Sequence, residues 1–271
     1  MQTTEKSTAL VDSLFEAGSH IAYTRSRRHP SQKANIFGVK NRTEIFDLEK
    51  TEGKLQKAEE AARAMGKSRA QLLIVGTKFE ARALVIAEAK AAGLPYVSER
   101  WLGGTLTNFT EIKKRIARLE DLTTRREKKQ LGMYTKKERL GFDKEIDKLN
   151  RFFAGIVNMK GMPGGLFIID SREEVTAVDE ARQLNIPIIA LTGSDCDVSR
   201  VNYAIPANDA SRASISFVMG RIITAYNDGL ASAPELVTKP AVTHTEPSLA
   251  IPEGTKSPKS STATSILASA E

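Results

Sequence analysis

The sequence predicts an α/β protein in which helices flank a parallel β-sheet, and three observations support this prediction. Short apolar runs such as QLLIVG (71–76) and IPIIALTG (186–193) are typical of strands that are buried on both faces. Segments with helical periodicity separate these runs, and strands alternating with helices indicate a parallel sheet with right-handed crossovers. The stretch from 98 to 165 is too long for one crossover, so it must contain an insertion.

The N-terminal part is expected to begin with a short helix at 5–17, where apolar residues recur at helical spacing before Gly18. Residues 19–42 are expected to form a loop, because Pro30 and Gly38 interrupt regular structure. Asn208 or Asp209 can cap a final helix. Between these, strands are expected at 43–48, 71–76, 95–98, 165–170, 186–193 and 202–206, and helices at 49–65, 78–92 and 175–184.

The insertion is expected to be a helical hairpin. Apolar residues recur every three or four positions within 107–130, LGMY (131–134) interrupts, and Thr135 with Glu138 has the spacing of a capping box that starts a new helix. Two helices with narrow apolar stripes are predicted to pack as an antiparallel coiled coil. We therefore expect an α/β globular domain from 1–106 and 155–230, an inserted hairpin at 107–154, and a disordered, proline-rich tail at 231–271.

Composition narrows the class of protein. The formal net charge of +7 favours a polyanionic partner. A single cysteine, Cys196, excludes an intrachain disulfide framework and a cysteine-rich zinc site, and indicates a reducing compartment. Because no run is long and apolar enough for a signal peptide or a membrane helix, we expect a cytoplasmic protein without a membrane partner.

The sequence contains no strong catalytic motif. Gly66-Lys67-Ser68 lacks the glycine that a phosphate-binding loop needs five positions earlier, and the segment after Gly76 lacks dinucleotide-binding spacing. Asp195-Cys196-Asp197 follows a strand, where α/β enzymes place ligands, but a polar turn around a buried cysteine is commoner. We expect no enzyme, cofactor, metal site or small-molecule substrate. The alternative is a sugar-phosphate-binding or flavodoxin-like protein that uses Gly76, Asp170 and Asp195.

Basic residues indicate contact with RNA. Residues 19–42 carry six cations and no acid, interleaved with aromatic rings that can stack on bases. Trp101, with Arg100 and Asn108, suits either a binding platform or ordinary core packing. The hairpin has a net charge of +6 over 111–151, and a coiled-coil interaction module without RNA contact is a third alternative. The candidate RNA-binding residues are Arg25, Arg27, Arg28, Lys33, Lys40, Arg42, Arg100, Trp101, Asn108, Lys113, Lys114, Arg115 and Arg118.

The chain resembles the bacterial family of small-subunit ribosomal protein number two. The block ERWLGGTLTNF (99–109) is highly specific to that family. The matching stretches are IFGVKNRTEIFDLEKT (36–51), LLIVGTKFEA (72–81), GLPYVSERWLGGTLTNFTEIKKRI (93–116), MKGMPGGLFIIDSREE (159–174), IPIIALTGSDCD (186–197) and NYAIPANDASRASI (202–215).

This resemblance implies a flavodoxin-like sheet with an inserted coiled-coil hairpin, and a structural role in the small ribosomal subunit. It also implies partners, namely ribosomal RNA and neighbouring ribosomal proteins, including protein number one, which captures messenger RNA. Some members of the family are recorded with zinc. Here Tyr23 and the stretch Arg28-His29-Pro30 depart from the histidine and tryptophan that members often carry in this segment. We therefore do not expect this chain to share the zinc site of those members.

Overall fold

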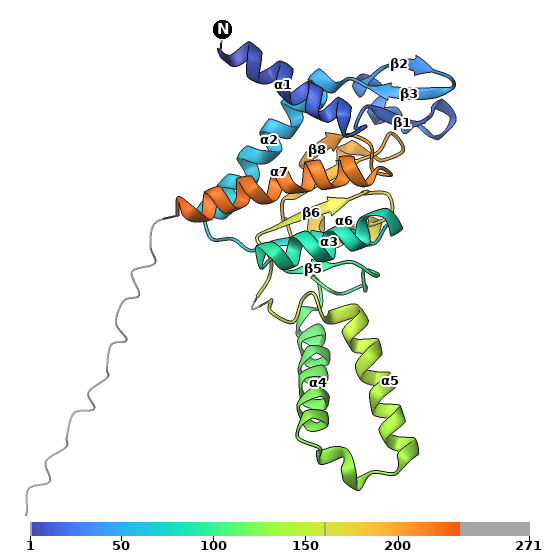
Figure 1. Cartoon of the computed structure of the whole chain (residues 1–271), viewed down its shortest axis with the longest axis vertical. Coiled ribbons are helices and arrows are strands. Elements are labelled where there is room, and N and C mark those ends of the chain that lie inside the picture. Colours follow the sequence, from blue (N-terminus) through green and yellow to red (C-terminus); the bar gives the residue numbers. More distant parts are fainter. Residues whose placement is uncertain (1, 160, 234–271) are drawn as a thin grey trace, which may run out of the picture. The chain divides into compact units, whose positions relative to one another are not determined.

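The computed structural model describes residues 2–159 and 161–233 (Figure 1). The tail predicted to be disordered lies outside the described residues from 234 onward. The predicted tail begins at Ala231, but the structure has this residue as the last one of a helix. The folded part therefore ends slightly later than expected. None of the described helices combines the length and hydrophobicity needed to cross a membrane.

A five-stranded parallel sheet forms the centre of the fold, in the order β5-β4-β6-β7-β8. Every residue of β4, β6 and β7 is buried, as their continuous apolar sequences predict. The register pairs Leu72 with Gly165 and Leu166 with Ile188. The strands are β4 (Leu72–Val75), β5 (Tyr96–Val97), β6 (Gly165–Ile169), β7 (Ile188–Thr192) and β8 (Tyr203–Pro206).

Helices cover both faces of this sheet, which confirms the predicted α/β class. On one face, alternate strand residues such as Ile74 and Phe167 pack against α2 (Leu48–Lys67), α3 (Phe79–Ala92) and α7 (Arg212–Ala231). On the other face, Leu73 and Ile168 pack against α6 (Val175–Gln183) and the base of the hairpin. Ser211, whose hydroxyl accepts a bond from the amide of Ser214, caps α7; the predicted caps, Asn208 and Asp209, lie three and two residues too early.

The N-terminal segment differs from the prediction. After α1 (Gln2–Glu16), the expected loop instead forms β1 (Ile21–Thr24), two 3-10 turns, η1 (Arg25–Arg27) and η2 (Pro30–Asn35), and β2 (Ile36–Lys40). With β3 (Thr43–Phe46) these strands make a separate antiparallel sheet in the order β1-β3-β2, so β3 does not join the parallel sheet. Asn41 and Arg42, with φ of 52° and 65°, form the two-residue turn that allows this hairpin.

The insertion consists of α4 (Phe109–Glu127), the 3-10 turn η3 (Gln130–Met133) and α5 (Lys136–Phe153), and the two long helices lie side by side in Figure 1. The predicted capping box between Thr135 and Glu138 is present and starts α5. The stripes Ile112, Ile116, Leu119, Leu122 and Ile146, Leu149, Phe153 are buried. Packing as a coiled coil and the domain boundaries at 107 and 154 stay predictions.

Candidate nucleic-acid interface

The basic N-terminal segment presents four exposed cations. Arg25 lies on η1, Lys33 on η2, Lys40 at the end of β2, and Arg42 in the turn before β3. Within the described part of the chain, none of these four side chains forms an ion pair. Their charges are therefore available to an anionic partner.

Arg28 has a different role from the one predicted for it. Its guanidinium donates to Glu44 Oε1 at 2.8 Å, and Glu44 is fully buried on β3. The second carboxylate oxygen of Glu44 has no hydrogen-bond partner among the described residues, so this buried charge depends on Arg28. Arg28 therefore stabilises the small sheet, because its removal would leave a buried carboxylate unpaired, and its contact with RNA stays a prediction.

Arg27 is anchored at the C-terminal edge of the parallel sheet. Its guanidinium donates to Asp195 Oδ2 at 3.1 Å and lies over the Tyr23 ring, 4.3 Å from the centroid. Arg172, in the turn after β6, donates to the same oxygen at 2.6 Å. Asp195 is nearly buried, whereas both arginine side chains are more than half exposed, at 53% and 56%.

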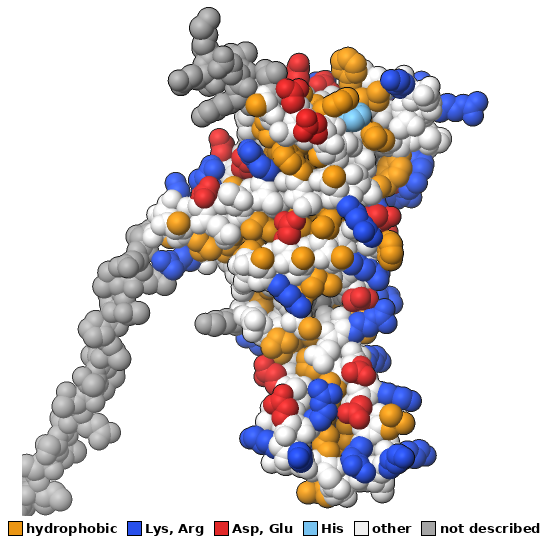
Figure 2. All heavy atoms as spheres, in the orientation of Figure 1, with side chains coloured by type: hydrophobic (Ala, Val, Ile, Leu, Met, Phe, Trp, Pro, Cys, Tyr) orange, Lys and Arg blue, Asp and Glu red, His pale blue; other side chains and the backbone are white. Residues whose placement is uncertain are grey.

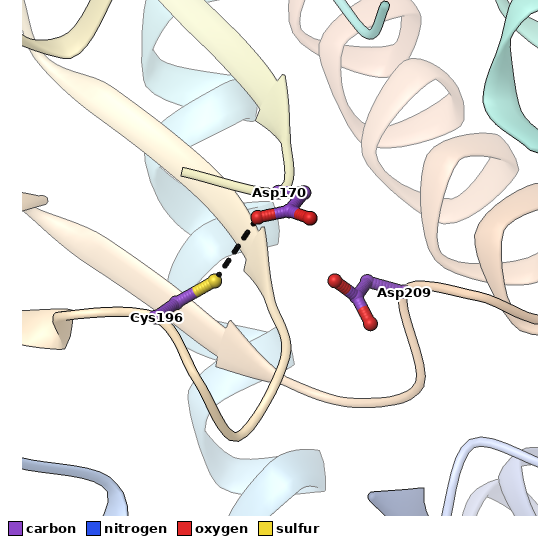
Figure 3. Close-up of side chains that lie close together, drawn as sticks. All are labelled: Asp170, Cys196 and Asp209. Atoms are coloured by element: carbon purple, nitrogen blue, oxygen red, sulfur yellow. Dashed lines mark hydrogen bonds between the residues drawn. The ribbon is translucent and has the colours of Figure 1, made fainter. Parts of the chain in front are cut away.

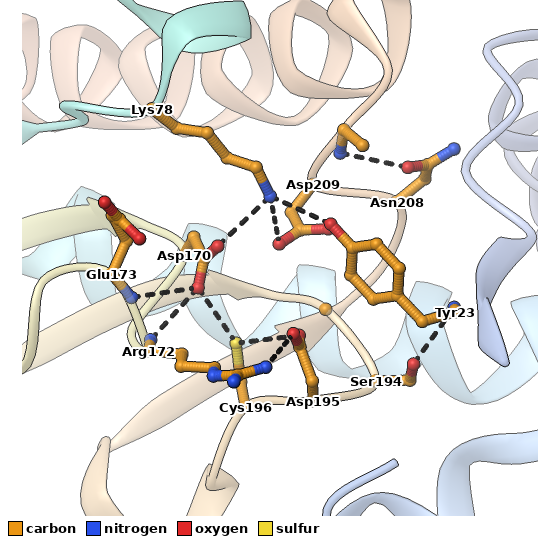
Figure 4. A network of polar contacts seen from close by, with 12 residues as sticks. Tyr23, Lys78, Asp170, Arg172, Glu173, Ser194, Asp195, Cys196, Asn208 and Asp209 are labelled. Atoms are coloured by element: carbon orange, nitrogen blue, oxygen red, sulfur yellow. Dashed lines mark hydrogen bonds and ion pairs between the residues drawn. The ribbon is translucent and has the colours of Figure 1, made fainter. Parts of the chain in front are cut away.

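Lys78, at the start of α3, holds the small sheet against this edge (Figure 4). Its ammonium donates to Tyr23 on β1 at 3.0 Å, to Asp170 at 3.1 Å and to Asp209 at 2.9 Å. Burial alone would lower the pKa of Lys78, but the two carboxylates outweigh it and raise the pKa, so the lysine stays charged. Asp170 adopts a left-handed backbone conformation with φ of 65°, which turns the chain after β6.

The same edge contains the one group of possible metal ligands found among the described residues, Asp170, Cys196 and Asp209 (Figure 3). Their ligand atoms lie within 4.8 Å of one another. This donor set does not fit a zinc ion, because the Lys78 ammonium already binds both carboxylates. Burial and the neighbouring carboxylates also raise the pKa of the Cys196 thiol, so a zinc ion would have to displace the thiol proton as well as the ammonium.

The junction before the hairpin is organised by Glu180 on α6. Its carboxylate accepts bonds from Trp101 Nε1 at 3.0 Å, the amides of Gly104, Leu106 and Thr107 at 2.8, 2.9 and 3.1 Å, and the Thr107 hydroxyl at 3.2 Å. Burial alone would raise the pKa of Glu180, but these donors lower it. The carboxylate is therefore ionised and holds the loop.

Trp101 belongs to the core and is 7% exposed. Its prediction as an RNA-binding residue is corrected in favour of the packing alternative, because a buried ring cannot stack on a base. Arg100 is exposed beside it and lines a polar pocket. Asn108 is exposed at the start of α4, where its carbonyl, not its side chain, accepts the first amide bonds of the helix.

The predicted cations of the hairpin are mostly paired. Lys114 contacts Glu111 at 2.6 Å, Arg118 contacts Glu145 at 3.3 Å, and Lys113 lies over the ring of Phe109. Arg115 is exposed on the same helix. These contacts are intrahairpin, and therefore favour a stabilising role for this part of α4.

Cations without an ion pair in the described structure gather at the far end of the hairpin, where Figure 2 shows Lys and Arg side chains around an apolar tip. These distal cations are Arg126, Lys128, Lys129, Lys136, Lys137 and Arg139. Met133 within η3 is 84% exposed among them. The sequence carries a signal that could have identified this cluster, because residues 125–139 contain seven basic and two acidic side chains.

Sequence reasoning missed Lys78, Arg172 and Glu180 as organising residues. Each acts on groups far away in the chain: Glu180, for example, bonds Trp101 across 79 residues. The sequence pointed to this edge only through Gly76, Asp170 and Asp195, which lie at or just after the ends of predicted strands.

A comparison with known protein families matches residues 14–229 to Ribosomal protein S2. The matched range includes the parallel sheet, the small N-terminal sheet and the inserted hairpin, and so covers most of the chain. It also includes the block at 99–109 on which the resemblance rests. The chain belongs to the ribosomal protein S2 family, a structural class of small-subunit ribosomal proteins.

Proposed function

We propose that this structural ribosomal protein binds small-subunit ribosomal RNA through the basic N-terminal segment. The observation that carries the proposal is the set of four exposed cations on Arg25, Lys33, Lys40 and Arg42, none of which is neutralised by an acid of the described chain. Phosphates neutralised by such side chains release counterions, so binding should weaken steeply as salt rises. The family places the protein at the ribosome, and we infer a cytoplasmic location there.

The test uses the full chain and transcribed small-subunit RNA. Replacing Lys33, Lys40 and Arg42 with glutamine should lower affinity and reduce the steepness of the salt dependence by about 0.7–0.9 per lost phosphate contact. The matched control removes the same charge elsewhere, by changing the exposed Lys57, Lys67 and Lys90 on α2 and α3 to glutamine. Equal losses in both triple variants would show that net charge, not this segment, drives binding.

We propose that the hairpin adds a second contact through its tip. The support is the concentration of exposed cations without an ion pair around η3, whereas the cations elsewhere on the hairpin are sparser and several of them, such as Lys114 and Arg118, are paired. Changing Lys136 and Lys137 to glutamine should weaken RNA binding, whereas changing Lys144 and Lys148, farther along α5, should not. Equal affinities for the two double variants would assign RNA contact to the globular part alone.

We also propose that the small sheet helps anchor ribosomal protein number one. β2 is an edge strand, and Phe37 and Val39 on it are 79% and 57% exposed. An open strand edge with exposed apolar residues suits the addition of a peptide strand. Phe37→Ser should weaken binding of purified protein number one in calorimetry. Phe79→Ser, which removes a 74% exposed ring from α3, is the control.

A further inference from the structure

Two arginines meet on one buried oxygen at the edge of the parallel sheet. Arg27 Nη2 and Arg172 Nη1 lie 3.1 and 2.6 Å from Asp195 Oδ2. Three separate segments bring them there: η1, the turn after β6, and the loop after β7. We propose that Arg27 and Arg172 form a clamp for one phosphate group of the RNA backbone, with Asp195 as the residue that positions both guanidiniums. This inference rests on the proposed RNA binding and deepens it.

The geometry suits a phosphate. Because both nitrogens contact the same oxygen, they lie within about 6 Å of each other, a span that one phosphate can bridge with charge-assisted bonds of about 2.7–2.9 Å. A guanidinium has five N–H donors, and a bond to Asp195 does not exhaust them. More than half of each arginine side chain is exposed, so an anion in solvent can reach the donors.

Both guanidiniums are held in place before any ligand arrives. Arg27 is fixed by Asp195 on one side and by the Tyr23 ring on the other, while Tyr23 is itself held by Lys78. The backbone of Arg172 is fixed because its amide donates to Asp170 Oδ1 at 3.0 Å. A preorganised pair loses little side-chain entropy on binding, which separates this arrangement from flexible surface lysines.

The three groups of the clamp carry a net charge of +1, because two guanidiniums share one carboxylate. Beside them, the ammonium of Lys78 is already paired with Asp170 and Asp209, so the free donors at the surface of this edge belong to the two arginines. The exposed Arg25 belongs to the same 3-10 turn as Arg27. The clamp therefore extends the basic N-terminal segment across to β6, and adds Arg172, which no pattern in the sequence identifies.

The experiment measures the affinity of the full chain for transcribed small-subunit RNA as salt varies. Arg172→Gln should lower affinity about five- to twentyfold and reduce the steepness of the salt dependence by about 0.7–0.9. Arg172→Lys keeps the charge without the fork and should recover only part of the loss. The control is Arg221→Gln, which removes an arginine of similar exposure (42%) that is paired with Glu59 between α7 and α2.

Inorganic phosphate, added at constant ionic strength, separates two sources of the anion. A difference between the wild type and Arg172→Gln that persists in phosphate supports a backbone phosphate, whereas its disappearance would assign the clamp to free phosphate and overturn the RNA assignment. If the wild type binds RNA and Arg172→Gln binds within twofold of it, the clamp is refuted while the proposed function stands. Full recovery by Arg172→Lys would refute the forked geometry. A wild type that does not bind RNA refutes both.

Discussion

Replacing Glu180 with glutamine should destabilise the protein, because one carboxylate holds the whole junction before the hairpin. Oε1 accepts from the Trp101 indole and the Gly104 amide, and Oε2 accepts from Leu106 and from both donors of Thr107. Glutamine has the same shape, but its NH2 group is a donor. In either amide orientation it faces at least two N–H groups that need an acceptor.

The size of the effect follows from these contacts. A hydrogen bond to a charged group contributes about 1.5–3 kcal/mol, and at least two are lost. Neutral glutamine does not carry the cost of burying a charge, and this gain offsets part of the loss of hydrogen bonds. We therefore expect the free energy of unfolding to fall by about 2–4 kcal/mol. Because the folded pKa of Glu180 is lowered, its contribution is present above the unfolded pKa of about 4.3 and is lost as the pH falls through the folded value. The difference between the variants should therefore be full at neutral pH and shrink in acid.

Urea unfolding at neutral pH measures this difference. Trp101 is the only tryptophan in the chain, so its fluorescence reports on the junction, and far-ultraviolet circular dichroism reports on the helices of the whole fold. Glu173→Gln, an exposed position in the turn after β6, is the control. If Glu180→Gln and Glu173→Gln unfold at the same urea concentration with the same slope, the carboxylate does not organise the junction and the reasoning fails.

Four further substitutions test the fold. Glu174→Gln should be tolerated and should flatten the decline of stability as pH rises, because burial raises the pKa of Glu174 and a group with a raised folded pKa loses its stabilising effect as pH passes through that value. Unfolding free energies measured from pH 5 to 8 check this. Gly66→Ala should lower the free energy of unfolding by about 1–3 kcal/mol, since a Cβ would clash with the carbonyl of Tyr226 on α7. Gly53→Ala, with open space in the same helix, should instead raise it by about 0.5–1 kcal/mol. Thr135→Ala removes the capping box of α5 and should cost about 0.5–2 kcal/mol, visible as faster amide exchange in the first turn of that helix; unchanged exchange would contradict it.

The parallel sheet could be predicted from sequence because its signal is local. Runs such as 72–75 and 188–192 are apolar throughout, and burial on both faces is the physical cause of that pattern. The capping box at Thr135 could also be predicted, because its two partners lie only three residues apart. The small antiparallel sheet was missed because its strands are short, and its turn, Asn41-Arg42, lacks the glycine that usually marks such a hairpin.

The candidate surface could be predicted only in outline, since a charge becomes available or neutralised through partners that lie far along the chain. Residues 19–42 contain no acid, yet the fold brings Glu44 to Arg28 and Asp195 to Arg27, so two of the six cations are paired. A partner can remove a cation from the surface or position it there. Glu44 is buried with Arg28 largely covered, whereas Asp195 leaves Arg27 half exposed and adds Arg172 beside it. The same kind of ion pair therefore supports the core in one place and prepares an anion site in the other, and the exposure of the arginine decides which.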